Sequence, residues 1–410
     1  MLTEDAEQDD LRGGHSPWFA GARTLPKLRL TENARCDVLV IGAGITGSLV
    51  AEHLTAQGLD VCIVDRERPG FGSTAASTAM LLWELDQPLR KLAISHGFDQ
   101  AAHIVRQCVW AADGLQQLIM ELDVACDLRR APSLYLSAAE VGARELLEEH
   151  ELRNRAGLPG SFLDHRALAS LYRVEREAAL VSPGSADLDP VRLAQGLLGI
   201  AVRRGARLID AHAESFDSDP REASIETDCG HVISAKWIVL ATGYAMPDFI
   251  RSDVHQLASS WAICTSPQQP DALWPEGALI WEASEDYHYA RTTADGRIIM
   301  GGEDESDIVE PDARDGLIPA KARTLRAELS KLRPHADPRI EFAWSGAFGK
   351  TVDGLPMIGR IAGHRRILGA YGYGGNGITF SYLASRIVHD VMTGDEREWF
   401  DALSFERDAR

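Results

Sequence analysis

The stretch Asp37-Val-Leu-Val-Ile-Gly-Ala-Gly-Ile-Thr-Gly47 decides the fold of this chain. It opens with an apolar run that is typical of a strand buried on both faces of a parallel sheet. Three glycines follow: Gly42 permits a tight turn into a helix, Gly44 lets backbone approach a pyrophosphate, and Gly47 lets the helix pack on the strand. Phosphates bind at such a helix N-terminus because its free N–H groups and dipole favour anions.

The residues that follow complete a βαβ unit. Apolar side chains recur at helical spacing from Ile45 to Leu54, Gly58 ends the helix, and residues 59–64 form a second buried strand that ends at Asp65. Asp65 lies about twenty residues after Gly42, where an acid binds ribose hydroxyls and disfavours a 2′-phosphate. The whole pattern predicts a dinucleotide site rather than a merely structural glycine-rich turn.

The rest of the chain predicts an α/β protein of two interleaved domains. Helical periodicity is found over 97–122, 140–156, 164–172, 190–204, 320–332 and 378–392. Buried strands are predicted at 207–210, 236–241 and 367–370, and short alternating strands at 278–282, 287–291 and 297–301 indicate an antiparallel sheet. We predict a nucleotide-binding domain from 35–85, 181–250 and 340–395, a substrate domain from 86–180 and 251–339, a surface arm at 1–34, and a tail at 396–410.

Composition excludes several classes of partner. The chain has 410 residues and a formal net charge of −19, which repels nucleic acid and anionic lipid and mildly favours a cationic substrate. Six cysteines lie far apart without metal-ligand spacing, so we predict reduced thiols and no metal site. The acidic start lacks the features of a signal peptide, and no apolar run is long enough to span a membrane. These features predict a cytoplasmic protein; they leave its oligomeric state open.

A second glycine pattern bears on the choice between FAD and NAD. Gly372-Tyr-Gly-Gly-Asn-Gly377 follows a predicted strand, but no second strand ending in an acid comes after it. This loop is therefore better suited to hold another part of the same cofactor than to bind a second nucleotide. One cofactor held at two distant segments indicates FAD.

These elements resemble the D-amino-acid oxidase-like FAD-dependent oxidoreductases, which include glycine oxidase, sarcosine oxidase and related amine dehydrogenases. The resemblance covers residues 36–395 and rests on the segments 42–47, 65–66, 72–78, 241–243, 295–302, 351–359 and 372–379. It implies a glutathione-reductase-type fold, in which an FAD-binding Rossmann-like domain is interleaved with an antiparallel-sheet substrate domain.

The resemblance also implies the residues that hold FAD. They are Gly42, Ala43, Gly44, Ile45, Thr46 and Gly47 at the pyrophosphate, Asp65, Arg66 and Ala213 at the adenosine, Gly72, Ser73, Thr74, Ser77 and Thr78 at phosphate or the flavin edge, Ala241, Thr242 and Gly243, Asp353 near the flavin, and Gly374, Gly375, Asn376, Gly377, Ile378 and Thr379 at the flavin pyrimidine. The alternative for residues 73–78 is a polar turn with a helix cap, and for Asp353 an Asx-turn.

Departures from the family pattern are informative. Gly346 stands where sarcosine oxidases carry the flavin-linked Cys, and Thr74–Thr78 replace the His loop of other relatives, so we predict noncovalent FAD. Ile299 stands where sarcosine oxidases carry the Lys that helps to activate oxygen. The electron acceptor is therefore either oxygen or another carrier. The cations that bind substrate carboxylate in relatives correspond to Phe348 and Thr379.

The strand Tyr287-His-Tyr-Ala-Arg291 carries the predicted catalytic residues. Alternation places Tyr287, Tyr289 and Arg291 on one face and His288 on the other. His288 matches an active-site aromatic of relatives, and Arg291 could pair with a substrate carboxylate. The alternatives are a structural His288 and an Arg291 paired with Asp286 or Glu303. Trp261 and Trp281 either wall the pocket or pack in a core.

We therefore predict an FAD-dependent enzyme that oxidises a C–N bond of an amine or amino-acid derivative. Hydride would pass to flavin N5, water would hydrolyse the imine, and oxygen or another carrier would accept the electrons. Two alternatives remain at this point: oxidation of a C–OH bond in a 2-hydroxy acid, and a flavin-binding subunit without turnover of its own.

Overall fold

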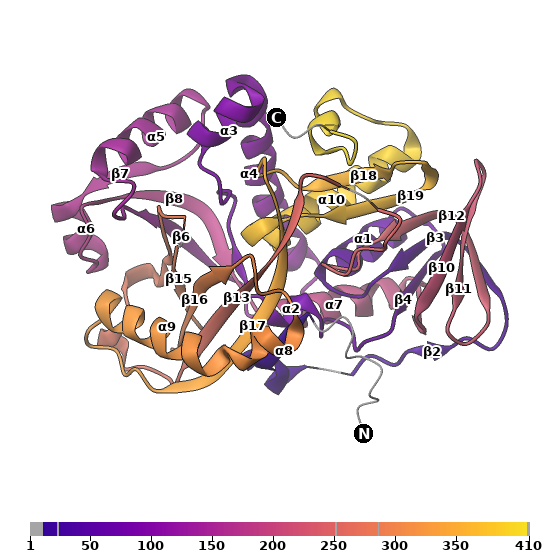
Figure 1. Ribbon diagram of the computed structural model, residues 1–410, viewed down its shortest axis with the longest axis horizontal. Coiled ribbons are helices and arrows are strands. Elements are labelled where there is room, and N and C mark those ends of the chain that lie inside the picture. Colours follow the sequence, from indigo (N-terminus) through magenta and orange to yellow (C-terminus); the bar gives the residue numbers. More distant parts are fainter. Residues whose placement is uncertain (1–10, 23, 251, 286, 408–410) are drawn as a thin grey trace.

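The βαβ unit predicted from the sequence lies at the centre of the fold. The computed structural model describes residues 11–22, 24–250, 252–285 and 287–407 (Figure 1). Strand β3 (Ala34–Ile41) leads through the glycine turn into helix α1 (Ile45–Ala56) and strand β4 (Val61–Asp65), which pairs with β3 in parallel. The first strand, the helix and the second strand of the prediction are thereby confirmed.

A nine-stranded sheet grows around this unit in the described part of the chain. Its order is β10-β11-β12-β3-β4-β9-β2, with β19 beside β12 and β18 beside β19. The added strands are β2 (Leu28–Arg29), β9 (Arg207–Asp210), β10 (Ala213–Ser218), β11 (Ala223–Thr227), β12 (Val232–Leu240), β18 (Met357–Ile361) and β19 (His364–Tyr371). Alternate residues of β3 enter two different hydrophobic clusters, Val40 on one face and Leu39 on the other. This burial explains the uninterrupted apolar run.

The second sheet, of ten strands over the described residues, is mostly antiparallel. Its order is β1-β17-β13-β16-β15-β14-β6-β8-β5, with β7 beside β8. The strands are β1 (Arg12–His15), β5 (Met80–Leu81), β6 (Arg129–Leu136), β7 (Ser161–Asp164), β8 (Ala178–Asp187), β13 (His255–Thr265), β14 (Leu279–Glu282), β15 (Tyr289–Thr292), β16 (Ile298–Glu305) and β17 (Ile340–Thr351). The antiparallel substrate sheet expected from the short alternating strands is present, although β14 and β6 pair in parallel.

Helices cover both sheets and fill the space between them (Figure 1). Besides α1 they are α2 (Ser73–Ala76), α3 (Leu89–His96), α4 (Phe98–Glu121), α5 (Ala143–Arg155), α6 (His165–Tyr172), α7 (Pro190–Arg203), α8 (Pro311–Gly316), α9 (Ile318–Leu332) and α10 (Gly377–Thr393). The longer ones begin and end within a few residues of the predicted bounds. In the ranges that the structure describes, none is both long and apolar enough to cross a bilayer.

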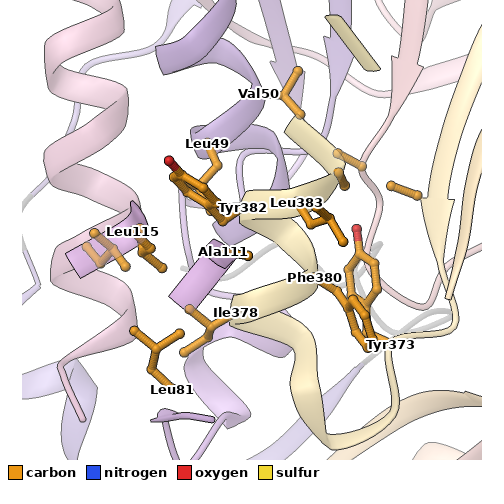
Figure 2. Close-up of a cluster of buried hydrophobic side chains, with 14 of the residues drawn as sticks. Leu49, Val50, Leu81, Ala111, Leu115, Tyr373, Ile378, Phe380, Tyr382 and Leu383 are labelled. Atoms are coloured by element: carbon orange, nitrogen blue, oxygen red, sulfur yellow. The ribbon is translucent and has the colours of Figure 1, made fainter. Parts of the chain in front are cut away.

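Helix α10 ties the second glycine loop to the core. Figure 2 shows its apolar side chains among residues of α1 and α4, with Phe380 beside Tyr373, Tyr382 near Leu49 and Ile378 near Leu81. Because Phe380 and Leu383 are buried, the start of α10 is fixed relative to the parallel sheet. The loop that precedes α10 is joined to this fixed start, so its position is constrained as well.

Two expectations about chain organisation differ from the structure. The described part of the arm is not only laid over the surface: β1 and β2 form an edge of each sheet, and Trp18 is 6 % exposed. The expected nucleotide-binding segments included 181–187 and 340–351, yet β8 and β17 pair in the antiparallel sheet. The reason is non-local strand pairing, which local periodicity does not report. The division into domains otherwise stays a prediction.

Candidate functional site

A long cavity of about 1430 Å³ lies between the two sheets. Its walls come from the β3–α1 turn, the end of β4, residues 70–78, the segments 211–216 and 241–249, the β13, β15 and β17 strands, and the loop before α10. The carboxyl ends of the parallel strands β3, β4 and β12 meet at this cavity, which is where open α/β sheets bind ligands. Residues of both glycine motifs line it.

The first glycine turn is shaped for close backbone approach. Gly42 has φ of +106°, and a Cβ there would lie 2.3 Å from the carbonyl oxygen of Ala241. A Cβ at Gly47 would lie 1.8 Å from the carbonyl oxygen of Gly42, so the helix can approach the strand only without a side chain. The backbone N–H of Ile45 donates to Thr74 Oγ1 at 2.9 Å. The two predicted phosphate segments are therefore adjacent.

Asp65 occupies the end of β4 as predicted. Its carboxylate accepts hydrogen bonds from the backbone N–H groups of Ala43 and Glu67, the latter at 2.7 Å. Burial raises the pKa of Asp65 to about 6, against the opposing effect of these hydrogen bonds. Arg66 and Ala213 line the same end of the cavity, which is the end expected for adenosine.

The loop before α10 lines another part of the cavity. Here Asp86 Oδ2 accepts a hydrogen bond from Gly375 N–H at 2.7 Å, and the Tyr287 hydroxyl donates to Asp86 Oδ1 at 3.4 Å. The carboxylate faces the cavity. The protein atoms around it reduce its contact with water, and this desolvation raises the pKa of Asp86. Among the described residues, no side chain forms an ion pair with it.

Aromatic side chains build the walls around Asp86. Trp281 lines the cavity and stacks on Tyr135 with ring centroids 4.0 Å apart; Tyr287 and Tyr289 lie beside it. Burial raises the pKa of both tyrosines, so their hydroxyls remain neutral hydrogen-bonding groups. Trp261 lines the cavity and also packs in the core.

Most of the predicted cofactor residues line this one cavity. They are Gly42, Gly44, Ile45, Thr46, Asp65, Arg66, Gly72, Ser73, Thr74, Ser77, Thr78, Ala213, Ala241, Thr242, Gly243, Gly374, Gly375, Gly377 and Ile378. Of the predicted catalytic residues, Tyr289 lines it. The structure thus brings together segments that are up to several hundred residues apart in the chain.

Four of the remaining predicted cofactor residues do not line the cavity but support residues that do. Ala43 and Gly47 shape the first turn from within. The Asn376 side-chain amide donates to the carbonyl of Glu84 at 2.6 Å, and Thr379 Oγ1 donates to the carbonyl of Leu82 at 2.6 Å. The last two therefore hold the segment that carries Asp86.

The structure contradicts the prediction that Asp353 lies near the flavin. Its Oδ1 accepts a hydrogen bond from the backbone N–H of Leu355, as in an Asx-turn, and its carboxylate pairs with Arg407 at 2.7 Å. It does not line the described cavity. Asp353 thus stabilises a turn and joins it to the C-terminal tail, because the buried Arg407 takes up its charge.

The structure also contradicts the prediction that Arg291 pairs with a substrate carboxylate. It is 2 % exposed, its Nη1 donates to the carbonyls of Ala79 and Leu188, and it lies 3.3 Å from Asp187. Along β15 the cavity is open at Tyr289, but at Arg291 other segments cover the same face. The pairing is therefore with Asp187 instead of Glu303, while the other suggested partner, Asp286, lies outside the described residues.

His288 fits its structural alternative. Its ring nitrogens lie 3.3 Å from Glu282 and 3.0 Å from Glu303, and the described cavity wall does not include it. Burial opposes a charge here, but the two carboxylates outweigh it and raise the pKa of His288. The imidazole is placed to hold the turn that carries Tyr287.

Sequence reasoning missed Asp86, Tyr244, Trp344 and Tyr373, all of which line the cavity. Tyr373 lies inside the second glycine motif, and this position could have predicted that it lines the cavity. Asp86 lies in an irregular segment without periodicity, and nothing local distinguishes it from any loop acid.

Comparison with known proteins agrees with this geometry. Residues 37–391 match the DAO family, described as FAD-dependent oxidoreductases. The chain belongs to this family. Similar proteins include γ-glutamylputrescine oxidoreductase of Escherichia coli (strain K12), 25% identical over 92% of this chain and 87% of that protein, and glycine oxidase of Bacillus licheniformis, 25% identical over 91% and 98%. Glycine oxidase from Geobacillus kaustophilus has the same fold, with a TM-score of 0.74 at 20% identity over 92% of this chain and 100% of that one.

As a DAO family member, the chain is an FAD-dependent oxidoreductase, and its cavity fits that cofactor. The glycine turn admits backbone approach to a pyrophosphate, Asp65 ends the second strand, and the second glycine loop lines the same cavity. None of the six cysteines lines the cavity, and Gly346 does. This supports the prediction of noncovalent FAD.

Proposed function

We propose that this enzyme oxidises a C–N bond in an amine or amino-acid derivative that binds as a cation. The Asp86 carboxylate carries the proposal, because it faces the cavity beside the loop predicted to wrap the flavin pyrimidine. Asp304 lines the same cavity. Of the described arginines that line it, Arg66 lies at the adenosine end and Arg12 beside Phe71. An ammonium group complements the Asp86 end.

The aromatic walls support the same class of substrate. Trp281, Tyr287 and Tyr289 present ring faces and edges near Asp86. Aromatic rings attract cations through their quadrupole, and this attraction grows where water is excluded. The walls also supply apolar surface for the carbon skeleton of the substrate.

The chemistry requires a neutral amine at the reacting carbon. When bound, FAD accepts the hydride at flavin N5. We assign to Asp86 the preceding step, in which its carboxylate takes one proton from the substrate ammonium. Burial raises the pKa of Asp86, which makes its carboxylate a better acceptor for that proton. Loss of hydride from the neutral amine leaves an iminium ion, which water hydrolyses to a carbonyl compound and an amine or ammonia.

Cations for a second substrate group are scarce at this end of the cavity. Phe348 lines it where relatives carry a carboxylate-binding Arg, Arg291 is bound to Asp187, and Thr379 bonds to backbone. A simple α-amino acid would place its carboxylate close to the reacting nitrogen without a partner. We therefore favour an amine whose carboxylate, if present, lies far from the oxidised carbon.

The relatives support an amine substrate through their names, since γ-glutamylputrescine and glycine both contain amino groups. Oxygen or another carrier remains the proposed electron acceptor. Ile299, at the position of the oxygen-activating Lys of relatives, lies in a hydrophobic core and cannot replace that Lys. A cytoplasmic location and the lack of a nucleic-acid partner are likewise part of the proposal.

Anaerobic stopped-flow reduction of the flavin tests this function. The panel would contain primary amines with distal carboxylates, N-methyl amino acids, D-amino acids and 2-hydroxy acids, followed by air. Bleaching by amines, with release of ammonia or free amine, is the expected result. Bleaching by 2-hydroxy acids alone would establish C–OH oxidation instead, and bleaching only after a second protein is added would indicate a flavin-binding subunit. The speed of recovery in air distinguishes oxygen from another acceptor.

A further inference from the structure

We propose that the N-terminal strap, residues 11–19, is part of the FAD site and limits FAD release. The strap holds the cofactor loop, residues 71–79, which carries predicted phosphate and flavin contacts. This inference goes beyond the proposed function, because it depends on FAD binding and not on the identity of the substrate. The two can therefore fail separately.

The strap is anchored independently of the cofactor loop. Strand β1 pairs with β17, with Arg12 opposite Gly346 and Gly14 opposite Trp344. The backbone N–H of Ala347 donates to the carbonyl of Leu11 at 2.9 Å. The first residues of the strap thus form an edge strand beside the cavity, and Leu11 and Arg12 line it.

From this anchor the strap binds the cofactor loop at two carbonyl groups. Arg12 Nε donates to the carbonyl of Phe71, and Trp18 Nε1 donates to the carbonyl of Ser77 at 2.8 Å. The Phe19 ring packs against Phe71 with centroids 5.1 Å apart. The two ends of the loop are therefore fixed to one short segment.

Two side chains from the antiparallel sheet complete the arrangement. Trp344 Nε1 donates to the carbonyl of Ala76 at 2.8 Å, and Arg291 Nη1 donates to that of Ala79 at 3.0 Å. The Arg291 guanidinium also lies over the Trp18 ring, 5.2 Å from its centroid. Arg291, which was predicted to bind substrate, therefore supports the strap.

These contacts decide which groups of the loop meet the cofactor. A carbonyl oxygen would repel phosphate, and at residues 71, 76, 77 and 79 each carbonyl is taken up by a donor outside the loop. Hydroxyl-bearing residues of the loop line the cavity, and Thr74 is hydrogen-bonded to the first glycine turn. The strap thus favours the loop conformation that binds FAD, and by linkage bound FAD must favour the docked strap.

Trp18→Phe tests the proposal, because it keeps a ring under Arg291 and removes the N–H that binds Ser77. Trp274→Phe is the matched control: Trp274 Nε1 donates to the carbonyl of Ala278 at 2.6 Å, is buried like Trp18, and is absent from the cavity wall that the structure describes. FAD release from the purified holoenzyme would be followed by the rise of free flavin fluorescence after dilution. Thermal unfolding of each apoprotein would report general stability.

We expect Trp18→Phe to release FAD about fivefold faster than wild type, the factor that corresponds to one lost hydrogen bond. Trp274→Phe should release FAD at the wild-type rate even if its apoprotein melts at an equally lowered temperature. Equal release rates in the two variants would overturn the proposal. If Trp18→Phe does not fold, Arg12→Met removes the donor to Phe71 and should accelerate release; an unchanged rate in that variant would also refute the role of the strap.

Discussion

Replacing Asp86 by Asn gives the sharpest test of how the substrate is bound. Asn retains an oxygen that can accept the Gly375 N–H bond, now 2.7 Å long, so the loop before α10 should keep its position and FAD should remain bound. The variant loses the negative charge that faces the cavity. A hydrogen bond to a charged group contributes about 1.5–3 kcal/mol. This range corresponds to amine binding weakened by about tenfold to a hundredfold.

The assay is the anaerobic rate of flavin reduction as a function of amine concentration, which separates apparent affinity from the limiting rate. Both should decrease in Asp86→Asn, the limiting rate because the proton acceptor is lost. In wild type, activity should fall as pH decreases through the raised pKa of Asp86, since the protonated carboxyl neither attracts nor deprotonates an ammonium. Asp113→Asn, an equal charge change at an exposed position of α4, is the control. Wild-type kinetics in Asp86→Asn, with FAD bound, would refute the reasoning.

Further predictions concern the cofactor, the turn that carries Tyr287, and the tail. Gly47→Ala should abolish FAD binding or folding because its Cβ would overlap a backbone oxygen, whereas Gly316→Ala, with open space around it, should retain flavin absorbance. Acid precipitation should release the flavin, and colour retained in the pellet would contradict noncovalent binding. His288→Gln should lower the free energy of unfolding most at acid pH, with the difference shrinking as pH rises through the raised pKa of His288; a pH-independent difference would argue against the ion pairs of His288 with Glu282 and Glu303. Arg407→Met leaves buried Asp353 unpaired and should destabilise the protein by about 3–5 kcal/mol, measured by urea unfolding; an unchanged midpoint would contradict this.

The parts that could be predicted are those encoded by neighbouring residues. The apolar run before Gly42, the glycine spacing and the acid at Asp65 determine the βαβ unit locally, and the structure confirms it. Strand alternation was similarly informative for Tyr289, which lines the cavity; Tyr287 lines it too, but from the turn before β15. It was insufficient for Arg291, because segments distant in the chain, at Ala79 and Leu188, cover that position.

The remaining differences have the same physical origin. Asp187 is opposite Arg129 across the β6–β8 pair, and it lies beside Arg291, more than a hundred residues away in the chain. Asp86 meets the second glycine loop through a contact between residues nearly three hundred positions apart. No local pattern records such a pairing, so the substrate end of the cavity was less predictable than the cofactor end.

The described arm supplies the outermost strand of one sheet through β1 and of the other through β2. A chain shortened to begin at the first long apolar strand, β3, would therefore leave β17 and β9 with unpaired N–H and C=O groups. Exposed strand edges of this kind are templates for pairing with other chains. Such a truncated protein should aggregate during refolding, even though the whole glycine fingerprint would still be present.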